Sequence, residues 1–252
     1  MSGKSIETKI PLFIKKFYNK TNYPGGYTNK EITDISDSYP FRKYINGKVL
    51  DAGCGTGMFT LAISKMNNVD TVVGVDFSNS LGTANKFKSK FNIDNVEFKK
   101  MDLNDIDFDF YNEFDTIFCS GVLHHMVNSE DVFKKLVKKL KTKGNIIIGV
   151  YHPLGRFFMN VKKQFIKLHK YFYFLDKRYR NNYSRKDEWI VDQYFNPYEK
   201  SFSRKEIKKW FEKSNIKFLD TYPKRYSKGG LYLMVGEVND KAERKKKREK
   251  NR

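Results

Sequence analysis

Apolar positions in the first 150 residues follow two alternating patterns. Short runs of β-branched and other apolar residues predict strands, and longer segments with apolar positions three or four residues apart predict helices. Strands are expected at Lys48–Asp51, Thr71–Asp76, Val96–Met101, Phe114–Cys119 and Asn145–Val150. Helices are expected at Phe59–Lys65, Ser78–Phe91 and Asp131–Leu140, with Ser78 as an N-cap and Gly144 closing the last helix. Strands separated by helices predict an α/β fold, a mostly parallel sheet with helices on both faces.

The alternation breaks after Val150. Residues 151–202 form a long segment rich in aromatic and basic side chains. Ser203, followed by Glu206 three residues later, predicts a capping box and a helix that ends near Ser214. Ile216–Thr221 and Leu231–Val238 read as two final strands. The basic stretch that follows is expected to be disordered or a solvated helix.

The composition fits one domain with an insertion. The chain has 252 residues, of which 39% are hydrophobic and 16% aromatic, enough to bury a core. No apolar run is long enough to span a bilayer, and the N-terminus does not resemble a signal peptide. Cys54 and Cys119 form no CxxC motif, which excludes a disulfide framework, and no cluster has metal-ligand spacing. Neither cysteine is expected to be a nucleophile, and the protein is expected in the cytoplasm.

The charge is large and unevenly placed. The formal net charge is +20, and 39 Lys stand against 10 Arg, which indicates compositional bias rather than a dedicated nucleic-acid binder. Residues 1–150 nevertheless hold 21 basic and 17 acidic side chains, whereas residues 151–252 hold 28 and 12. The second half is therefore a candidate for contact with a polyanion or an anionic membrane surface.

The most specific motif is DAGCGTG, which begins at Asp51 at the end of the first expected strand. Its glycines are Gly53, Gly55 and Gly57. The third glycine of a dinucleotide fingerprint would fall on Met58, which argues against NAD or FAD. An acid followed by three alternating glycines instead resembles motif I of the class I S-adenosylmethionine (SAM)-dependent methyltransferases.

The resemblance continues over residues 45–150. Asp76 ends the second strand, where the family's acid takes the ribose hydroxyls, and Phe77 would pack beside the adenine. Asp102 and the Leu103 backbone stand where the family holds the adenine amino group. Ser120 and the loop after it resemble the family's fourth strand and following loop. The resemblance implies SAM as cofactor and a Rossmann-like seven-stranded sheet whose last strand is inserted antiparallel.

The cofactor implied by the resemblance sets the chemistry. A sulfonium is a good leaving group, so the protein mainly aligns a nucleophile with the methyl group, and a hydroxyl or amine acceptor also needs a base. Candidates are His125, its neighbour His124 and His152, with one of the adjacent pair expected to be structural. Asp192 and Tyr194 are candidate acceptor contacts, together with Gln193 and Glu199.

These observations divide the chain into five segments. The resemblance implies that residues 1–44 form an N-terminal helical lid, with a plain surface loop as the alternative for Tyr18–Tyr27, and the residue expected over the cofactor is Tyr27. The SAM-binding core covers residues 45–150 and is completed by a helix and two strands at 203–238. A substrate-cap insert covers 151–202, and a basic disordered tail covers 239–252.

The insert begins with apolar residues at near-helical spacing. These are Phe157, Phe158, Val161, Phe165, Leu168 and Phe172, with lysines between them. The pattern predicts an amphipathic helix whose apolar face packs on the core. The same pattern also suits an anionic membrane, as a peripheral contact, or RNA.

Three hypotheses follow. The first is a methyltransferase that acts by in-line displacement on a small-molecule or lipid-like acceptor. The second is an RNA methyltransferase, most plausibly for tRNA, which explains the basic second half although no RNA-binding module is recognisable. The third is a non-catalytic SAM-binding protein. The acceptor atom and the oligomeric state do not follow from the sequence.

Overall fold

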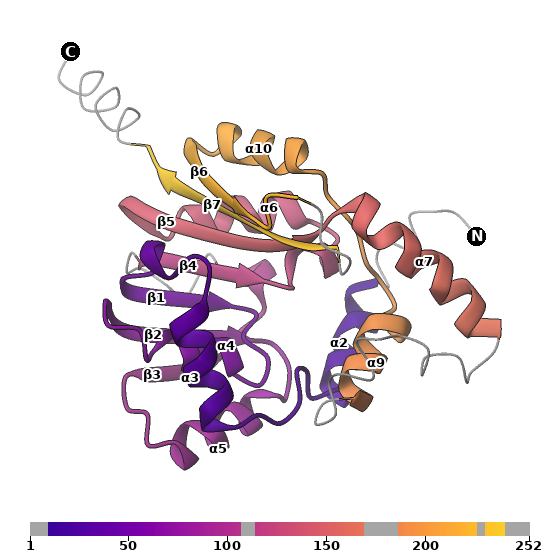
Figure 1. Ribbon diagram of the computed structural model, residues 1–252, viewed down its shortest axis with the longest axis horizontal. Helices are drawn as coiled ribbons and strands as arrows, with labels where there is room; N and C mark the ends of the chain where they lie inside the picture. Colours follow the sequence, from indigo (N-terminus) through magenta and orange to yellow (C-terminus); the bar gives the residue numbers. More distant parts are fainter. Residues whose placement is uncertain (1–9, 107–113, 169–185, 226–229, 240–252) are drawn as a thin grey trace.

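A computed structural model describes residues 10–106, 114–168, 186–225 and 230–239 of the chain (Figure 1). Its centre is one seven-stranded sheet with the order β3-β2-β1-β4-β5-β7-β6. The strands are β1 (Gly47–Ala52), β2 (Val69–Asp76), β3 (Val96–Lys100), β4 (Phe114–Ser120), β5 (Leu140–Tyr151), β6 (Ile216–Tyr222) and β7 (Leu231–Val238). The first five run parallel, and β7 is antiparallel to both β5 and β6. This confirms the fold that the sequence predicts.

The central strands are apolar because both faces of the sheet are covered. In β5, Ile146 and Ile148 face one core cluster while Ile147 faces the other. The alternation follows from the pleat, which sends successive side chains to opposite faces. A near-continuous apolar run is therefore the expected sequence of such a strand.

Helices cover both faces of the sheet (Figure 1). Side chains of α3 (Asn29–Ser38) and α4 (Met58–Ile63) lie in one core cluster, against which Phe87 of α5 (Leu81–Lys90) packs. Side chains of α6 (Ser129–Val137) and α10 (Arg204–Lys213) lie in the other. The short 3-10 helices are η1 (Arg42–Tyr44), η2 (Leu103–Asp105) and η3 (Leu123–His125).

The predicted capping box begins α10. Ser203 Oγ accepts from the Glu206 backbone N–H, and the Glu206 carboxylate accepts from the Ser203 N–H at 2.6 Å. A second box, formed by Thr28 and Glu31, begins α3. Each cap is worth about 1 kcal/mol of helix stability because it satisfies backbone N–H groups that have no partner within the helix.

Two local predictions are wrong. The helix expected over Asp131–Leu140 is α6, which ends at Val137, and Gly144 lies inside β5 rather than closing a helix. Leu140 is already paired with Phe114 of β4, so the register of the sheet ends the helix early. Ser78 does not cap α5, because the helix begins later, with Ser80 at the N-cap position, and Ser78 Oγ accepts from the Ser80 N–H at 3.3 Å in the turn before it.

Three further helices, α2 (Ile10–Lys20), α7 (Pro153–Leu168) and α9 (Lys186–Phe195), gather beyond the carboxyl ends of the parallel strands (Figure 1). The first belongs to the predicted N-terminal helical segment and the other two to the predicted insert, whose helical character is confirmed. Phe172 and the basic tail from residue 240 lie outside the described residues. The five segment boundaries remain predictions.

Two residues of the predicted apolar face of α7 are not buried. Phe157 and Val161 are 59% and 40% exposed, whereas Arg156 is fully buried. The side chains of Phe158, Phe165 and Leu168 lie outside the described ones. The Arg156 guanidinium lies against the Tyr151 ring and forms a two-pronged ion pair with Glu199, with Nε at 2.8 Å from Oε1. Because it is paired with a carboxylate, the charged Arg156 side chain can lie on the buried side of the helix.

Candidate functional site

The glycine loop after β1 forms one wall of a cavity of about 580 Å³ at the carboxyl edge of the sheet. This edge is where ligands bind in open α/β sheets, at the point where the strand order reverses, here between β1 and β4. Gly53 and Gly55 line the cavity with positive φ angles of 84° and 54°. A Cβ on Gly55 would lie 2.5 Å from the Tyr23 carbonyl oxygen. Glycine is therefore required both by conformation and by space.

Asp51 supports this loop from behind. It is buried, does not line the cavity, and accepts a hydrogen bond of 2.6 Å from Thr60 of α4. Burial raises the pKa of Asp51 to about 7. Gly57 also lies away from the cavity, against Phe98. Both residues serve the turn rather than the cavity wall.

Asp76 lies at the cavity as predicted and organises the loop. Its Oδ2 accepts from the Gly55 N–H at 2.9 Å and its Oδ1 from the Ser78 N–H at 2.8 Å. An ionised carboxylate has about four acceptor positions, so each oxygen can still accept from a ligand hydroxyl. Phe77, beside it, also lines the cavity.

Asp102 and Leu103 lie on the cavity wall after β3. Asp102 Oδ1 accepts from Asn104, and Oδ2 lies 2.7 Å from Lys15 Nζ of α2. Partial burial acts to raise the pKa of Asp102, but the hydrogen bonds from Lys15 and Asn104 outweigh it and lower this pKa. Asp102 is therefore ionised and joins the N-terminal helix to the core.

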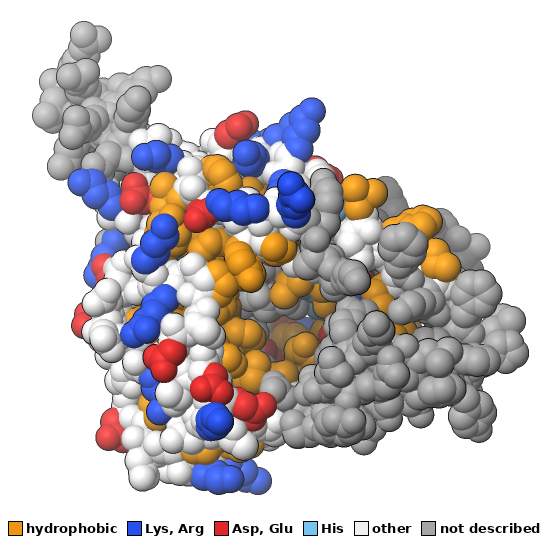
Figure 2. All heavy atoms as spheres, viewed as in Figure 1, with side chains coloured by type: hydrophobic (Ala, Val, Ile, Leu, Met, Phe, Trp, Pro, Cys, Tyr) orange, Lys and Arg blue, Asp and Glu red, His pale blue; other side chains and the backbone are white. Residues whose placement is uncertain are grey.

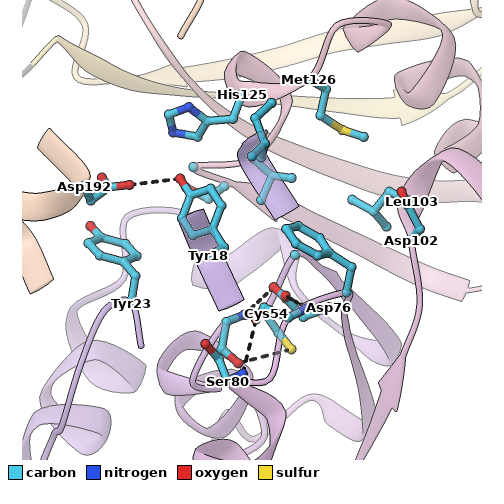
Figure 3. Close-up of a pocket in the computed structure, with 18 of the residues that line it drawn as sticks. Tyr18, Tyr23, Cys54, Asp76, Ser80, Asp102, Leu103, His125, Met126 and Asp192 are labelled. Atoms are coloured by element: carbon cyan, nitrogen blue, oxygen red, sulfur yellow. Dashed lines mark hydrogen bonds between the residues drawn. The ribbon is translucent and has the colours of Figure 1, made fainter. Parts of the chain in front are cut away.

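The other end of the cavity holds a polar cluster of Tyr18, His125, Tyr151 and Asp192 (Figure 3). Tyr18 comes from α2, Asp192 from α9, and His125 from η3 in the loop after β4. Tyr18 Oη donates to Asp192 Oδ1 at 2.9 Å, and the rings of Tyr18 and His125 are 5.9 Å apart. Tyr151 is the last residue of β5, so the cluster is assembled from four separate elements of the chain.

The hydrogen bonding of His125 defines its tautomer. Nδ1 lies 2.9 Å from the carbonyl oxygen of Tyr198, and because a carbonyl only accepts, Nδ1 carries the proton. Nε2 of the neutral ring is then an acceptor. Burial lowers the pKa of His125 below its usual value, although Asp192 acts in the opposite direction. The arrangement leaves a neutral imidazole at the cavity, which is the state that a general base requires.

A second layer fixes Asp192. Gln193 Nε2 donates to Asp192 Oδ2 at 3.0 Å and to Tyr151 Oη at 2.9 Å. Gln193 Oε1 accepts from Arg156 Nη1 at 2.7 Å. The buried Arg156–Glu199 ion pair thereby orients two side chains of the cavity without lining it.

Most of the predicted site residues line this cavity. These are Gly53, Gly55, Asp76, Phe77, Asp102, Leu103, Ser120, His125 and Asp192. The sequence analysis missed three tyrosines that also line it, Tyr18, Tyr23 and Tyr151. Tyr18 and Tyr23 lie within the expected lid stretch, where Tyr27 was favoured. Aromatic residues on the same segment were the available clue, but the orientation of Tyr18 depends on helix α2 and that of Tyr23 on the turn after it.

Tyr27 does not reach the cavity. Its hydroxyl donates to the Thr56 carbonyl oxygen at 2.6 Å, and its ring stacks on Phe87 with centroids 4.2 Å apart. Tyr23 and Pro24 of the same stretch line the cavity, whereas Tyr27 does not. Tyr27 fixes the glycine loop to α5.

The structure does not bring His152 or Tyr194 to the cavity. The His152 ring faces Tyr232, 5.8 Å away, and its Nδ1 accepts from the Leu154 N–H at the start of α7. Tyr194 is buried in α9 on another side than Asp192. His124 is buried beneath the Tyr151 ring, as expected for one member of the histidine pair. Within the described part of the chain, no three His, Cys, Asp or Glu residues cluster as metal ligands would.

Residues 45–215 match a family model described as a methyltransferase domain. The chain is 27% identical over 205 residues to an uncharacterized protein of Synechococcus, covering 68% of this chain and 48% of that protein. It is 29% identical over 155 residues to a tRNA U34 carboxymethyltransferase of Sulfurimonas denitrificans, covering 60% and 52%. The chain thus spans about half the length of the curated relatives it matches.

Solved structures share the fold. Magnesium protoporphyrin IX methyltransferase from Synechocystis, solved with S-adenosylhomocysteine (SAH), is similar with a TM-score of 0.58 and 16% identity, covering 94% of this chain and 99% of that one. An N-methyltransferase from Bradyrhizobium japonicum, also solved with SAH, has a TM-score of 0.54 and 13% identity, and the match covers 89% of this chain and 98% of that one. At these identities the likeness concerns the fold.

Proposed function

Because this chain belongs to the methyltransferase domain family, whose class I members use SAM, we propose that it transfers a methyl group from SAM to a small-molecule or lipid-like acceptor. The observation that carries the proposal is the cavity, which joins the glycine loop at one end to a neutral histidine at the other. A bound sulfonium would supply an activated methyl group. The residues of this chain need only bind, align and deprotonate.

The cofactor end fits the group that the family uses. A Cβ on Gly53 would lie 2.3 Å from Val122, so only glycine lets the glycine loop and the loop after β4 pack this closely in the cavity wall. Asp76 has acceptor capacity for ribose hydroxyls, and Phe77 offers a ring for the adenine. Asp102 Oδ2, now paired with Lys15, would accept from the adenine amino group. These roles follow the family pattern onto matching positions.

At the acceptor end, His125 Nε2 would take the proton of the attacking group. Asp192 stands in the same cluster and favours the protonated ring once it forms. Tyr18 keeps its hydroxyl proton because burial raises its pKa well above the usual value, so it orients Asp192 rather than acting as a base. We assign His125 as the general base and Asp192 as an acceptor contact.

A small acceptor is favoured by the helices that cover the cavity. Ile14, Lys15 and Tyr18 of α2 and Asp192 of α9 all line it, so ligand space is bounded on the side away from the sheet. Such an enclosed cavity suits an acceptor small enough to fit inside it completely. Its volume of about 580 Å³ lies within the range typical of small-ligand pockets.

Exposed apolar side chains on the covering helices support a lipid-like acceptor. Leu154, Phe157 and Val161 lie along α7, and Leu12 and Phe13 lie on α2. Figure 2 shows apolar side chains exposed on the flank where α7 lies. An anionic membrane would suit them together with the basic second half of the chain. No helix in the described ranges has the length and apolarity needed to cross a membrane. A cytoplasmic location stays a prediction.

An RNA acceptor is the second candidate, favoured by the relatives named as tRNA U34 carboxymethyltransferases and by the net charge of +20. A carboxymethyl donor, however, carries a carboxylate that needs a cation. Of the described residues that line the cavity, only Lys15 has a permanent positive charge, and it is paired with Asp102. This composition favours a plain methyl donor and a small acceptor. A non-catalytic SAM-binding role would leave the neutral His125 without a purpose.

The test is transfer of a radiolabelled methyl group from SAM by the full chain. Deproteinised small molecules, extracted lipids and total tRNA are offered separately. Label in the small-molecule or lipid fraction, absent from a His125→Asn variant, supports the proposal. Label in tRNA alone would favour the second candidate, and SAM binding without label in any fraction would favour the non-catalytic alternative.

A further inference from the structure

The cavity cluster of Tyr18, His125, Tyr151 and Asp192 offers hydrogen-bond acceptors and almost no donors. From this imbalance we infer that the acceptor substrate is an amine, held as its ammonium between Asp192 and His125. The inference rests on the proposed methyltransferase function and names the substrate class for the same site.

Asp192 provides the negative charge. It is 4% exposed and lines the cavity, yet its described hydrogen bonds come from the neutral groups of Tyr18, Gln193 and Asn196. No Lys or Arg of the described residues forms an ion pair with it. A buried carboxylate is stabilised most by a cation, and here the ligand is the group that can supply one.

His125 provides a second acceptor. Nδ1 donates its proton to the Tyr198 carbonyl, so Nε2 has a lone pair and no hydrogen. Among the described residues, none hydrogen bonds Nε2. An ammonium offers three N–H donors, which is enough for both His125 and Asp192.

The tyrosines add little donor capacity. The Tyr18 hydroxyl proton is used on Asp192, while its oxygen accepts from Asn196 Nδ2 at 2.8 Å. The Tyr151 oxygen accepts from Gln193 Nε2 at 2.9 Å, so its single hydroxyl proton is the one donor that this side chain can offer to a ligand. The face of the Tyr151 ring is already covered by the Arg156 guanidinium, whose Cζ lies 3.9 Å from the ring centroid.

The nearby cations do not change this balance. Arg156 directs its donors to Glu199 and Gln193, and Lys163 Nζ lies 3.3 Å from Glu199. Neither lines the cavity. A carboxylate or phosphate on the substrate's reacting end would therefore meet Asp192 without a compensating charge, which is costly in a buried site.

The chemistry balances with an amine. The substrate ammonium gives one proton to His125 Nε2, and Asp192 stabilises the imidazolium. The freed nitrogen lone pair forms the N–C bond to the methyl group while the C–S bond breaks and its electron pair stays on sulfur. The products are a thioether and the N-methylated ammonium, and His125 returns its proton to solvent on product release.

The experiment uses the full chain saturated with SAH and three matched probes: 2-phenylethylamine, 2-phenylethanol and phenylacetate. Dissociation constants are measured by ligand-observed NMR on the wild type, on Asp192→Asn and on Asp131→Asn. The last is a control, because Asp131 is an exposed carboxylate on α6 that does not line the cavity, and the substitution removes the same charge.

We expect the wild type to bind the amine about tenfold or more tightly than the alcohol and the carboxylate, as a charge-assisted contact warrants. Asp192→Asn should abolish this preference while SAH affinity is retained, and Asp131→Asn should keep it. Retained SAH affinity also demonstrates that the variant is folded. Normal SAH binding with no preference for the amine, including no binding of any probe, would overturn the inference and leave the proposed function standing. Loss of SAH binding by the wild type would instead defeat the proposed function.

Discussion

Tyr18 Oη donates a hydrogen bond of 2.9 Å to Asp192 Oδ1, across 174 positions of the chain. The bond joins α2 of the N-terminal segment to α9 of the insert, directly at the acceptor end of the cavity (Figure 3). Two segments outside the alternating core thereby become one cover. The polar cluster of Tyr18, His125, Tyr151 and Asp192 forms only when both segments are folded against the core.

Removal of this bond should loosen the cover. In Tyr18→Phe, Asp192 and Asn196 lose a buried partner, and we expect the free energy of unfolding to fall by about 1–3 kcal/mol. Urea denaturation measures the change. Tyr44→Phe is the control, since no described residue bonds the Tyr44 hydroxyl, and it should change stability by less than about 0.5 kcal/mol. Equal effects of the two substitutions would contradict the account.

The pH dependence of methyl transfer should report His125. Burial, the largest influence, lowers the pKa of His125 below its ordinary 6.5, so the base is already neutral at pH 7. The rate should therefore be level near neutrality and fall only as pH drops through this lowered pKa. His125→Asn should reduce kcat by about 10²–10⁴-fold and remove that acidic limb. If the fall in rate at acidic pH persists in the variant, a group other than His125 is responsible for it.

Asp51 should make the unliganded protein less stable as pH rises. Its folded pKa is about 7, raised by burial, against about 3.9 in an unfolded chain. The folded state then holds a proton that the unfolded state has lost, so stability declines between about pH 4 and pH 7, by up to roughly 4 kcal/mol. Asp51→Asn should flatten this part of the curve in urea titrations at several pH values. An unchanged slope would mean that Asp51 is ionised in the fold.

A substitution in the glycine loop should damage the protein, whereas the same substitution in α5 should stabilise it. Gly55→Ala places a Cβ 2.5 Å from the Tyr23 oxygen at a φ of 54°, so SAH binding should be lost or strongly weakened. Gly82→Ala lies in α5 with no atom within 4 Å of the new Cβ, and it should stabilise the protein by about 0.5–1 kcal/mol. Calorimetric titration and thermal unfolding test the pair. Normal SAH binding by Gly55→Ala would show that the glycine loop is not the cofactor wall.

Local motifs predicted the cofactor end of the cavity. The glycine loop and Asp102 follow a strand within a few residues, and Asp76 is the last residue of β2, so sequence neighbours are also spatial neighbours. The carboxyl ends of parallel strands meet at one edge, which brings these separate motifs together. The number of strands and the antiparallel last strand came from the family resemblance rather than from the residues.

The acceptor end could not be predicted in the same way. Tyr18, Tyr151 and Asp192 meet through contacts between segments that are far apart in sequence, and no local pattern encodes such pairing. Arg156 illustrates the limit most clearly. The apolar spacing of α7 places Phe157 and Val161 inside and the charge outside, but Glu199, 43 positions later, supplies the partner that reverses this orientation.

The most direct test of the account is calorimetric titration of the full chain with SAH, with NADH as the control ligand. We predict micromolar binding of SAH, no binding of NADH, and loss of at least tenfold in SAH affinity for Asp76→Ala, which removes the acceptor at the end of β2. Binding of NADH alone, or SAH affinity unchanged by Asp76→Ala, would contradict the central claim that this cavity is the cofactor site of a SAM-dependent methyltransferase.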